Sequence, residues 1–218
     1  MTMQKKKTYA VFGLGRYGAA VAKELANNNI EVLAVDINQK TVDELAPHLP
    51  VCKCADITEP EVIERLGISN IDTVIICMAN NLGASVMAVT LCKEAGVSNV
   101  IAKCSEEMHR KILLRVGADE VVFPEKESGV RLAKNLLSSG FVDMISLSDN
   151  VSIVEIDIKN DWVGKNLIEL NLRKKYDINV VAIRENGKVT VGVDPKKPLA
   201  KGMSLTLIAN TAKLSRLI

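Results

Sequence analysis

The stretch YAVFGLGRYG, residues 9–18, joins a short apolar run to a glycine-rich turn. Its glycines, Gly13, Gly15 and Gly18, form a G-x-G-x-x-G pattern between an expected strand and an expected helix. In that context Gly13 permits a tight turn, Gly15 lets a phosphate approach the backbone, and Gly18 lets helix and strand pack closely. The free N–H groups at the start of the helix favour anionic oxygen. The stretch therefore predicts a Rossmann-type turn that holds a diphosphate.

Apolar runs and segments of helical periodicity alternate from Tyr9 to Pro124. The runs are almost continuously apolar, as expected for parallel strands that are covered by helices on both faces. This alternation is typical of a doubly wound α/β fold with a parallel sheet. The expected strands are Tyr9–Phe12, Glu31–Asp36, Val51–Cys54, Thr73–Cys77, Asn99–Lys103 and Glu120–Phe123. The expected helices are Gly18–Asn28, Asn38–Leu45, Glu59–Leu66, Leu82–Ala95 and Glu106–Val116.

The pattern changes near residue 140. A further helix is expected at Lys126–Ser138, before Ser138-Ser139-Gly140, and a second unit begins near Phe141. We expect a Rossmann nucleotide-binding domain at 1–140, including that helix, and a small α+β domain at 141–218. In the small domain the pattern predicts strands Val151–Ile158, Asn179–Arg184, Lys188–Gly192 and Ser204–Ala209 and a short helix at Leu167–Lys175. The dipeptide Asn186-Gly187 predicts a hairpin.

Composition excludes several classes of protein. The 218 residues carry a net charge of +2 and only 3% aromatic residues, so we expect no nucleic acid partner. No uncharged apolar run approaches the roughly 20 residues that a membrane-spanning helix needs. The basic start is not followed by a secretory signal pattern, and five cysteines do not suggest a disulfide framework. We expect a cytoplasmic protein with buried, reduced thiols.

Three further residues are candidates for nucleotide binding. Asp36 ends the second expected strand, where a carboxylate accepts from ribose hydroxyls and repels a 2′-phosphate, which favours NAD or adenosine ligands over NADP. A glycine turn with Asp36 as a helix cap is the alternative. Arg16 lies in the loop and is positioned to reach a phosphate, or it is an exposed arginine paired at the surface. Asp56 follows the third strand, near an expected adenine position, or it is a turn residue.

Recognisable catalytic groups are missing. No tyrosine has a lysine four residues later, and the Cys52-x-Cys54 pair has no second pair to complete a zinc site. The two histidines, His48 and His109, are expected on or beside helices, and no P-loop is present. The nucleotide is therefore expected to act as a signal, without being consumed. A small NAD-dependent oxidoreductase is the alternative, because it would carry the same glycine loop and Asp36.

The chain resembles the RCK (regulator of K⁺ conductance, or KTN) proteins, and more narrowly the cytosolic subunit of bacterial Ktr/Trk potassium uptake systems. The motifs that carry the resemblance are residues 10–18, Val35-Asp36, Ala55-Asp56-Ile57-Thr58, Gly117-Ala118-Asp119-Glu120-Val121 and Pro124-Glu125. The resemblance covers nearly the whole chain, with a TrkA-N lobe, a crossover helix, and a TrkA-C lobe that matches Val151–Ile218. The combination is specific, whereas the glycine loop alone also occurs in many dehydrogenases.

The resemblance implies that the first lobe binds ATP, ADP or NAD(H). It also implies homodimers that assemble into an octameric ring on the inner face of the membrane, where the ring gates a pore-forming potassium transporter subunit. Arg16 matches a position that contacts the terminal phosphate across the dimer, and Glu125 one associated with Mg²⁺ or another cation. Glu125 is alternatively a helix-start residue, and Lys103 faces either ligand phosphates or solvent. The predicted nucleotide-binding residues are Gly13, Gly15, Arg16, Tyr17, Gly18, Asp36, Ile37, Asp56, Ile57, Ala79, Asn80, Lys103 and Glu125.

For the second lobe, the resemblance implies that cyclic di-AMP binds between two copies. The matching positions are Leu167, Asn171, Leu172, Arg173, Asn179 and Pro195. The alternative is that Leu167 and Leu172 form only the buried face of a short helix. Asn171 replaces a carboxylate that some relatives carry, which puts cyclic di-AMP binding in doubt. Taken together, the sequence predicts a regulatory, non-enzymatic, nucleotide-binding subunit.

Overall fold

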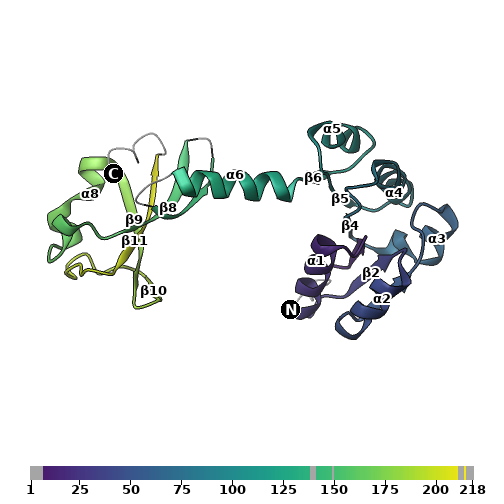
Figure 1. Ribbon diagram of the computed structural model, residues 1–218, viewed down its shortest axis with the longest axis horizontal. Helices are drawn as coiled ribbons and strands as arrows, with labels where there is room; N and C mark the ends of the chain where they lie inside the picture. The colour runs from purple at the N-terminus through teal and green to yellow at the C-terminus, as the bar shows by residue number, and fades with distance from the viewer. Residues whose placement is uncertain (1–6, 138–140, 149, 211–213, 215–218) are drawn as a thin grey trace, which may run out of the picture. The chain divides into compact units, whose positions relative to one another are not determined.

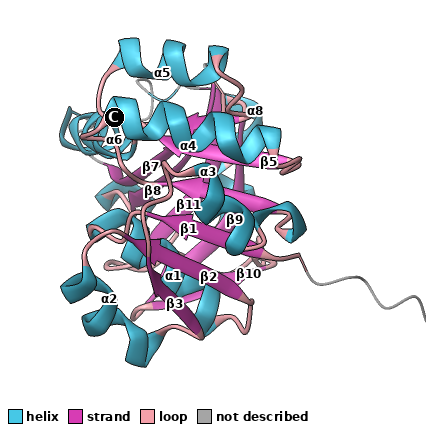
Figure 2. Cartoon of the chain, turned by 90° about the vertical axis from the view of Figure 1, so that its right-hand side faces the viewer, coloured by secondary structure: helices cyan, strands magenta, loops and turns pink. Residues whose placement is uncertain are grey.

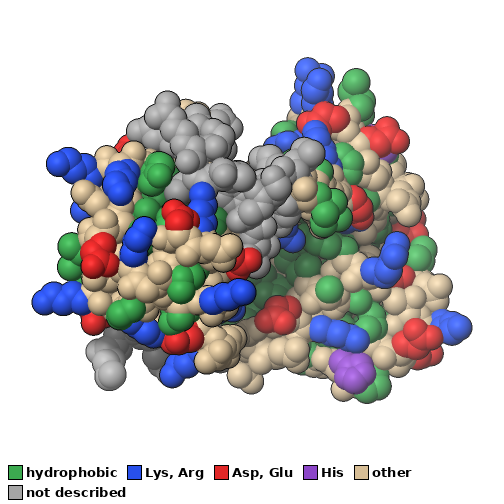
Figure 3. Space-filling view, turned by 60° about the vertical axis from the view of Figure 1, so that its left-hand side comes forward, with side chains coloured by type: hydrophobic (Ala, Val, Ile, Leu, Met, Phe, Trp, Pro, Cys, Tyr) green, Lys and Arg blue, Asp and Glu red, His purple; other side chains and the backbone are tan. Residues whose placement is uncertain are grey.

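The computed structural model describes residues 7–137, 141–148, 150–210 and 214. It consists of two compact units, residues 1–125 and residues 126–218 (Figure 1). Each unit has hydrophobic clusters of its own. Among the described residues, no helix is long and apolar enough to cross a bilayer. Basic and acidic side chains are interspersed on the face drawn in Figure 3.

The first unit is built on a six-stranded parallel sheet with the order β3-β2-β1-β4-β5-β6. This is the doubly wound Rossmann order, and the predicted fold class is confirmed. The strands are β1 (Tyr9–Phe12), β2 (Val32–Asp36), β3 (Val51–Cys54), β4 (Thr73–Ile76), β5 (Asn99–Lys103) and β6 (Glu120–Val122). The helices are α1 (Arg16–Asn27), α2 (Gln39–Leu45), α3 (Pro60–Arg65), α4 (Leu82–Glu94) and α5 (Glu107–Arg115), with 3-10 turns η1 (Ala46–His48) and η2 (Ile68–Asn70).

Helices cover both faces of this sheet because alternate strand residues point to opposite sides. Ala10 and Phe12 pack in a cluster with residues of α3, α4 and α5, whereas Val11 between them packs with residues of α1 and α2. Figure 2 shows α2 close to the edge strand β3 and its neighbour β2. Both clusters consist almost entirely of aliphatic side chains, as the low aromatic content requires.

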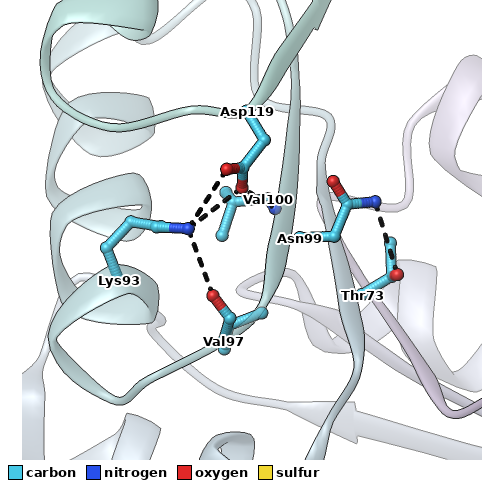
Figure 4. Close-up of polar contacts among 6 residues, drawn as sticks. All are labelled: Thr73, Lys93, Val97, Asn99, Val100 and Asp119. Atoms are coloured by element: carbon cyan, nitrogen blue, oxygen red, sulfur yellow. Dashed lines mark hydrogen bonds and ion pairs between the residues drawn. The ribbon is translucent and has the colours of Figure 1, made fainter.

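Asp119, the last residue of the Gly117-Ala118-Asp119 motif, directly precedes β6 and bonds to residues of α4 and of the neighbouring strand β5 (Figure 4). The Asp119 carboxylate accepts from the backbone N–H of Val100 at 2.7 Å and from Lys93 Nζ at 3.0 Å. Lys93 Nζ also donates to the Val97 carbonyl at 3.2 Å. The motif therefore joins α4 and its following loop to the start of the two outer strands.

The second unit contains a five-stranded antiparallel sheet with the order β10-β9-β11-β8-β7. The strands are β7 (Phe141–Ser146), β8 (Val151–Asp157), β9 (Ile178–Glu185), β10 (Lys188–Val191) and β11 (Ser204–Asn210); the helices are η3 (Asn160–Trp162), α7 (Leu167–Leu170) and α8 (Leu172–Tyr176). Helix α6 (Pro124–Leu137) begins with the last two residues of the first unit and continues into the second. β9 and β10 pair antiparallel across Asn186 and Gly187, which both have positive φ, at 49° and 78°. This is the backbone of a type I′ turn, and the predicted hairpin is confirmed.

Two predictions about the second unit were wrong. Strand β7 was not expected, because the register shift between Phe141 and Asp143 breaks the alternation by which a strand is recognised. The single helix expected at Leu167–Lys175 is two short helices, since Asn171 adopts a left-handed conformation with φ of 46°. The helix predicted at Lys126–Ser138 begins earlier, at Pro124, and Ser138, Ser139 and Gly140 lie outside the described residues.

Candidate functional site

The three glycines of the loop meet different requirements. Gly13 has φ of 86°, and a Cβ there would lie 2.9 Å from Met78 Cγ. A Cβ on Gly18 would lie 2.0 Å from the Gly13 carbonyl oxygen, so the chain itself demands glycine at both positions. A Cβ on Gly15 would have no neighbouring atom within 4 Å. The backbone of Gly15 therefore faces open space, as a phosphate-binding turn requires.

Asp36 holds the glycine loop in place. Its Oδ2 accepts from the backbone N–H of Leu14 at 2.6 Å, and its Oδ1 accepts from that of Asn38 at 2.8 Å. The cap of α2 is Asn38, whose side chain accepts from the N–H groups of Lys40 and Thr41, so Asp36 is not the helix cap. Each carboxylate oxygen can accept more than one hydrogen bond, so Asp36 retains acceptor capacity for a ribose hydroxyl.

Two cavities border the loop, of about 920 Å³ and about 320 Å³. Both are lined in part by Met78 and Asn81, so they adjoin at the end of β4. Of the predicted residues, the larger cavity is lined by Gly15, Arg16, Tyr17, Ala79, Asn80, Lys103 and Glu125. The smaller is lined by Gly13, Asp36, Ile37, Asp56 and Ile57. Gly18 lies beneath the loop, in contact with Gly13.

The smaller cavity combines apolar walls with two carboxylates. Asp56 Oδ1 accepts from the backbone N–H and the hydroxyl of Thr58, at 2.9 and 2.7 Å, and these bonds hold its pKa below the ordinary value. Asp56 is thus a turn residue that also lines the cavity. Ile37 is 68% exposed at the rim, and Ile57 is buried. An adenosine fits this chemistry, with apolar contact for the base and acceptors for the ribose.

The larger cavity contains the charged groups. Lys103 Nζ lies 2.6 Å from Glu125 Oε1 and 5.7 Å from the centre of the Tyr17 ring. The hydrogen bond from Lys103 lowers the pKa of Glu125, with a smaller contribution from Arg16. The Glu125 carboxylate is therefore charged at neutral pH. Lys103, for which a solvent position was the alternative, has a side chain that is only 12% exposed.

Several lining residues were missed from the sequence: Cys77, Met78, Asn81 and Ala20. The first three directly follow β4, which pairs with β1, so their carboxyl-terminal position was the available signal. Burial raises the pKa of the Cys77 thiol to about 12, so this thiol is neutral. Asn81 also accepts from the Ala84 N–H as the cap of α4.

The cysteines are free thiols, but they are not uniformly buried as predicted. Cys92 and Cys104 are buried, whereas Cys54 is exposed, with its Sγ 3.4 Å from the Ile37 carbonyl oxygen. Burial raises the pKa of Cys92 to about 12. Cys52 and Cys54 are not part of a cluster that could hold a metal ion, because the described part of the chain contains no such cluster of three or more His, Cys, Asp and Glu side chains.

The six positions matched to cyclic di-AMP binding lie in the second unit. Leu172 is 4% exposed and Leu167 packs against the same hydrophobic cluster, so both contribute to the core. The other four, Asn171, Arg173, Asn179 and Pro195, are exposed. The Ile168 N–H donates to the Pro195 carbonyl at 3.4 Å, which places Pro195 beside α7.

A Rossmann sheet whose glycine loop opens onto two cavities is typical of the dinucleotide-binding class of domains. Residues 9–124 match the TrkA-N domain, and residues 151–218 match the TrkA-C domain. The chain therefore belongs to the TrkA-N/TrkA-C family of potassium-uptake proteins, and the resemblance seen in the sequence is confirmed.

Two relatives from Bacillus subtilis (strain 168) are similar over nearly their whole length. "Ktr system potassium uptake protein C" is 35% identical, over 97% of this chain and 96% of that protein. "Ktr system potassium uptake protein A" is 34% identical, with the same coverage. The solved structure titled "GsuK channel bound to NAD" has the same fold, with a TM-score of 0.65 and 18% identity. It matches all of this chain, which spans 40% of that channel chain.

Proposed function

We propose that the protein is a nucleotide-binding, non-enzymatic regulatory subunit of a potassium uptake system. The observation that carries this is the open space at Gly15, with an adenosine-sized cavity on one side and the charged cavity of Arg16 and Lys103 on the other. The potassium-uptake relatives supply the process in which such a site would act.

The two cavities suggest how a ligand lies. The base and ribose occupy the smaller cavity beside Asp36 and Asp56, the phosphates cross Gly15, and the terminal group enters the larger cavity. ATP, ADP and NAD(H) all fit this division. In a ring built from dimers, Arg16 would contact a terminal phosphate bound in the neighbouring copy.

A divalent cation would be held by Glu125 together with ligand phosphates. Mg²⁺ is usually bound by one or two carboxylates plus substrate phosphates, so one carboxylate at the cavity wall is an adequate protein contribution. The cation would neutralise the repulsion between Glu125 and the phosphates. Lys103 holds this carboxylate when no ligand is bound.

The proposed mechanism is a shift in population between ring states. ATP and ADP differ by one charged group, so a ring state that contacts this group gains differential affinity, and this difference can move a gate. The partner would be a pore-forming potassium transporter subunit at the inner face of the membrane, on which an octameric ring docks. The second unit would contribute dimer contacts and sense cyclic di-AMP through its exposed positions, with Arg173 on a phosphate.

Replacing Arg16 tests the proposed function directly. Arg16→Ala should reduce the difference between ATP and ADP affinity more than it reduces adenosine affinity, because the guanidinium acts on the terminal phosphate. Titration calorimetry with all three ligands measures this. Equal losses for ATP and ADP would contradict the assignment. Turnover of NADH by the purified protein would instead favour the oxidoreductase alternative.

A further inference from the structure

The Lys103–Glu125 ion pair lies in the cavity where we place the ligand phosphates. Lys103 ends β5, and Glu125 lies in the first turn of α6. Their charged atoms are 2.6 Å apart, and both side chains line the cavity that Gly15 and Arg16 also line. A phosphate that passes over Gly15 into this cavity therefore meets a lysine that is already paired.

The two partners are held very differently. The Lys103 side chain is 12% exposed, and its ammonium lies near the Tyr17 ring, 5.7 Å from the ring centre. The Glu125 side chain is 62% exposed. Because a partly exposed ion pair contributes little net stability, the carboxylate can move into water at small cost. The lysine cannot do so without leaving its packed position.

An anionic ligand changes this balance. An ammonium has three donors, but a carboxylate and a phosphate on one ammonium repel each other strongly in a partly enclosed cavity. The more exposed anion is the one that leaves. We propose that Lys103 exchanges Glu125 for a ligand phosphate, so that Glu125 is an internal competitor for the lysine that binds polyphosphate. The inference rests on the proposed nucleotide site and adds which contact in that site changes when a phosphate binds.

The exchange has a consequence for α6. In the ligand-free protein, the ion pair ties the first turn of α6 to the end of β5. A phosphate-bearing ligand releases this tie, whereas adenosine leaves it in place. The first turn of the helix that follows the nucleotide-binding sheet would thus change its contacts only when phosphate is present.

A double-mutant cycle tests the exchange on the full-length protein in EDTA, with ADP and adenosine titrated by calorimetry. Glu125→Gln should tighten ADP binding about twofold to fivefold and leave adenosine binding unchanged. Lys103→Met should weaken ADP binding, and adding Glu125→Gln to it should then give no gain. Glu120→Gln is the matched control, because Glu120 is exposed at the start of β6 and does not line the cavity. Lys103→Gln replaces Lys103→Met if that variant does not fold.

Each outcome bears on a different claim. Unchanged or weaker ADP binding by Glu125→Gln would overturn the exchange. An equal gain with and without Lys103 would also overturn it, since Glu125 would then repel the ligand directly. If Glu120→Gln tightens ADP binding as much as Glu125→Gln does, the gain comes from the change in net charge alone, and the exchange is overturned as well. A wild-type protein that binds ADP and adenosine in none of these titrations would overturn the proposed function itself.

Discussion

Gly15 and Gly18 belong to one motif, but glycine is needed at the two positions for different reasons. Gly18 is required by the fold, because a side chain there would collide with the Gly13 carbonyl. Gly15 has an ordinary φ of −62° and open space, so the folded chain alone does not require glycine there. Gly15 is the N-cap of α1, where glycine is a favoured residue, and its open backbone fits the close approach of a phosphate that we propose.

This difference predicts opposite effects for two alanine variants. Gly18→Ala should lower the free energy of unfolding by about 1–3 kcal/mol through overpacking. Gly15→Ala should lower it by no more than about 1 kcal/mol, because alanine is a poorer N-cap of α1 than glycine, while weakening ATP binding. Urea unfolding and calorimetric titration measure both quantities. Undiminished ATP binding by the Gly15→Ala variant would contradict the proposal that a phosphate binds at this turn.

Charged residues of the candidate site could be predicted from the sequence. Arg16, Asp36 and Lys103 were predicted because each charged group ends a strand or lies in the loop, and all three line one of the two cavities. Met78 and Asn81 were missed, since an apolar side chain and a helix-capping amide resemble ordinary structural residues until the sheet order places them at the cavity. The pairing of Lys103 with Glu125, 22 residues apart, is likewise a product of the fold.

At the level of elements, Asp119 connects α4 to the β5–β6 edge. Burial acts to raise its pKa, but the hydrogen bonds from the Val100 N–H and Lys93 outweigh burial, and the net pKa is lowered. A carboxyl whose pKa is lowered on folding stabilises the folded state above its unfolded pKa, and this contribution is lost as pH falls through the folded pKa.

Asp119→Ala should therefore lower the free energy of unfolding by about 1–3 kcal/mol at neutral pH, because it leaves the buried Val100 N–H without its acceptor. The difference from wild type should narrow below about pH 4, near the ordinary pKa of aspartate. Denaturant unfolding across pH measures this, and Asp119→Asn, which keeps an acceptor oxygen, should lose less. A difference that stays constant down to pH 2 would contradict the role of the charge.

Regular elements were predicted well, and irregular ones were not. All six strands of the parallel sheet were expected, because their apolar runs are continuous. Helices α7 and α8 were merged, since Asn171 in the left-handed region leaves no mark on helical periodicity. The hairpin at Asn186-Gly187 was predicted correctly because both residue types favour the positive φ that the turn needs.

At the scale of the whole molecule, the chain is two units with separate cores that divide after residue 125, whereas the sequence pattern changes near residue 140. The domain limits 1–140 and 141–218 stay a prediction, as does assembly into a ring. The first unit contains the two cavities beside the glycine loop, and the second contains a small antiparallel sheet. Among the described residues, neither unit has a helix that is long and apolar enough to cross a membrane.

Assembly gives a direct prediction. Light scattering on the purified protein with ATP should give a particle of about eight times the 23.7 kDa chain mass. ADP should change the shape or the elution volume of this particle, because the terminal phosphate is proposed to select the ring state. A monomer under every nucleotide condition would contradict the ring.

The exposed Cys54 gives this protein a built-in attachment point for a reporter group. The buried Cys92 and Cys104 are shielded from reagents, and the Cys77 and Cys92 thiols, with pKa values near 12, are almost wholly protonated at neutral pH. Cys54 lies against the Ile37 carbonyl, at the rim of the smaller cavity. A fluorophore attached there would lie beside the entry of the proposed adenosine site and should report binding, with Cys52, which is partly exposed, as the second thiol to be checked for labelling.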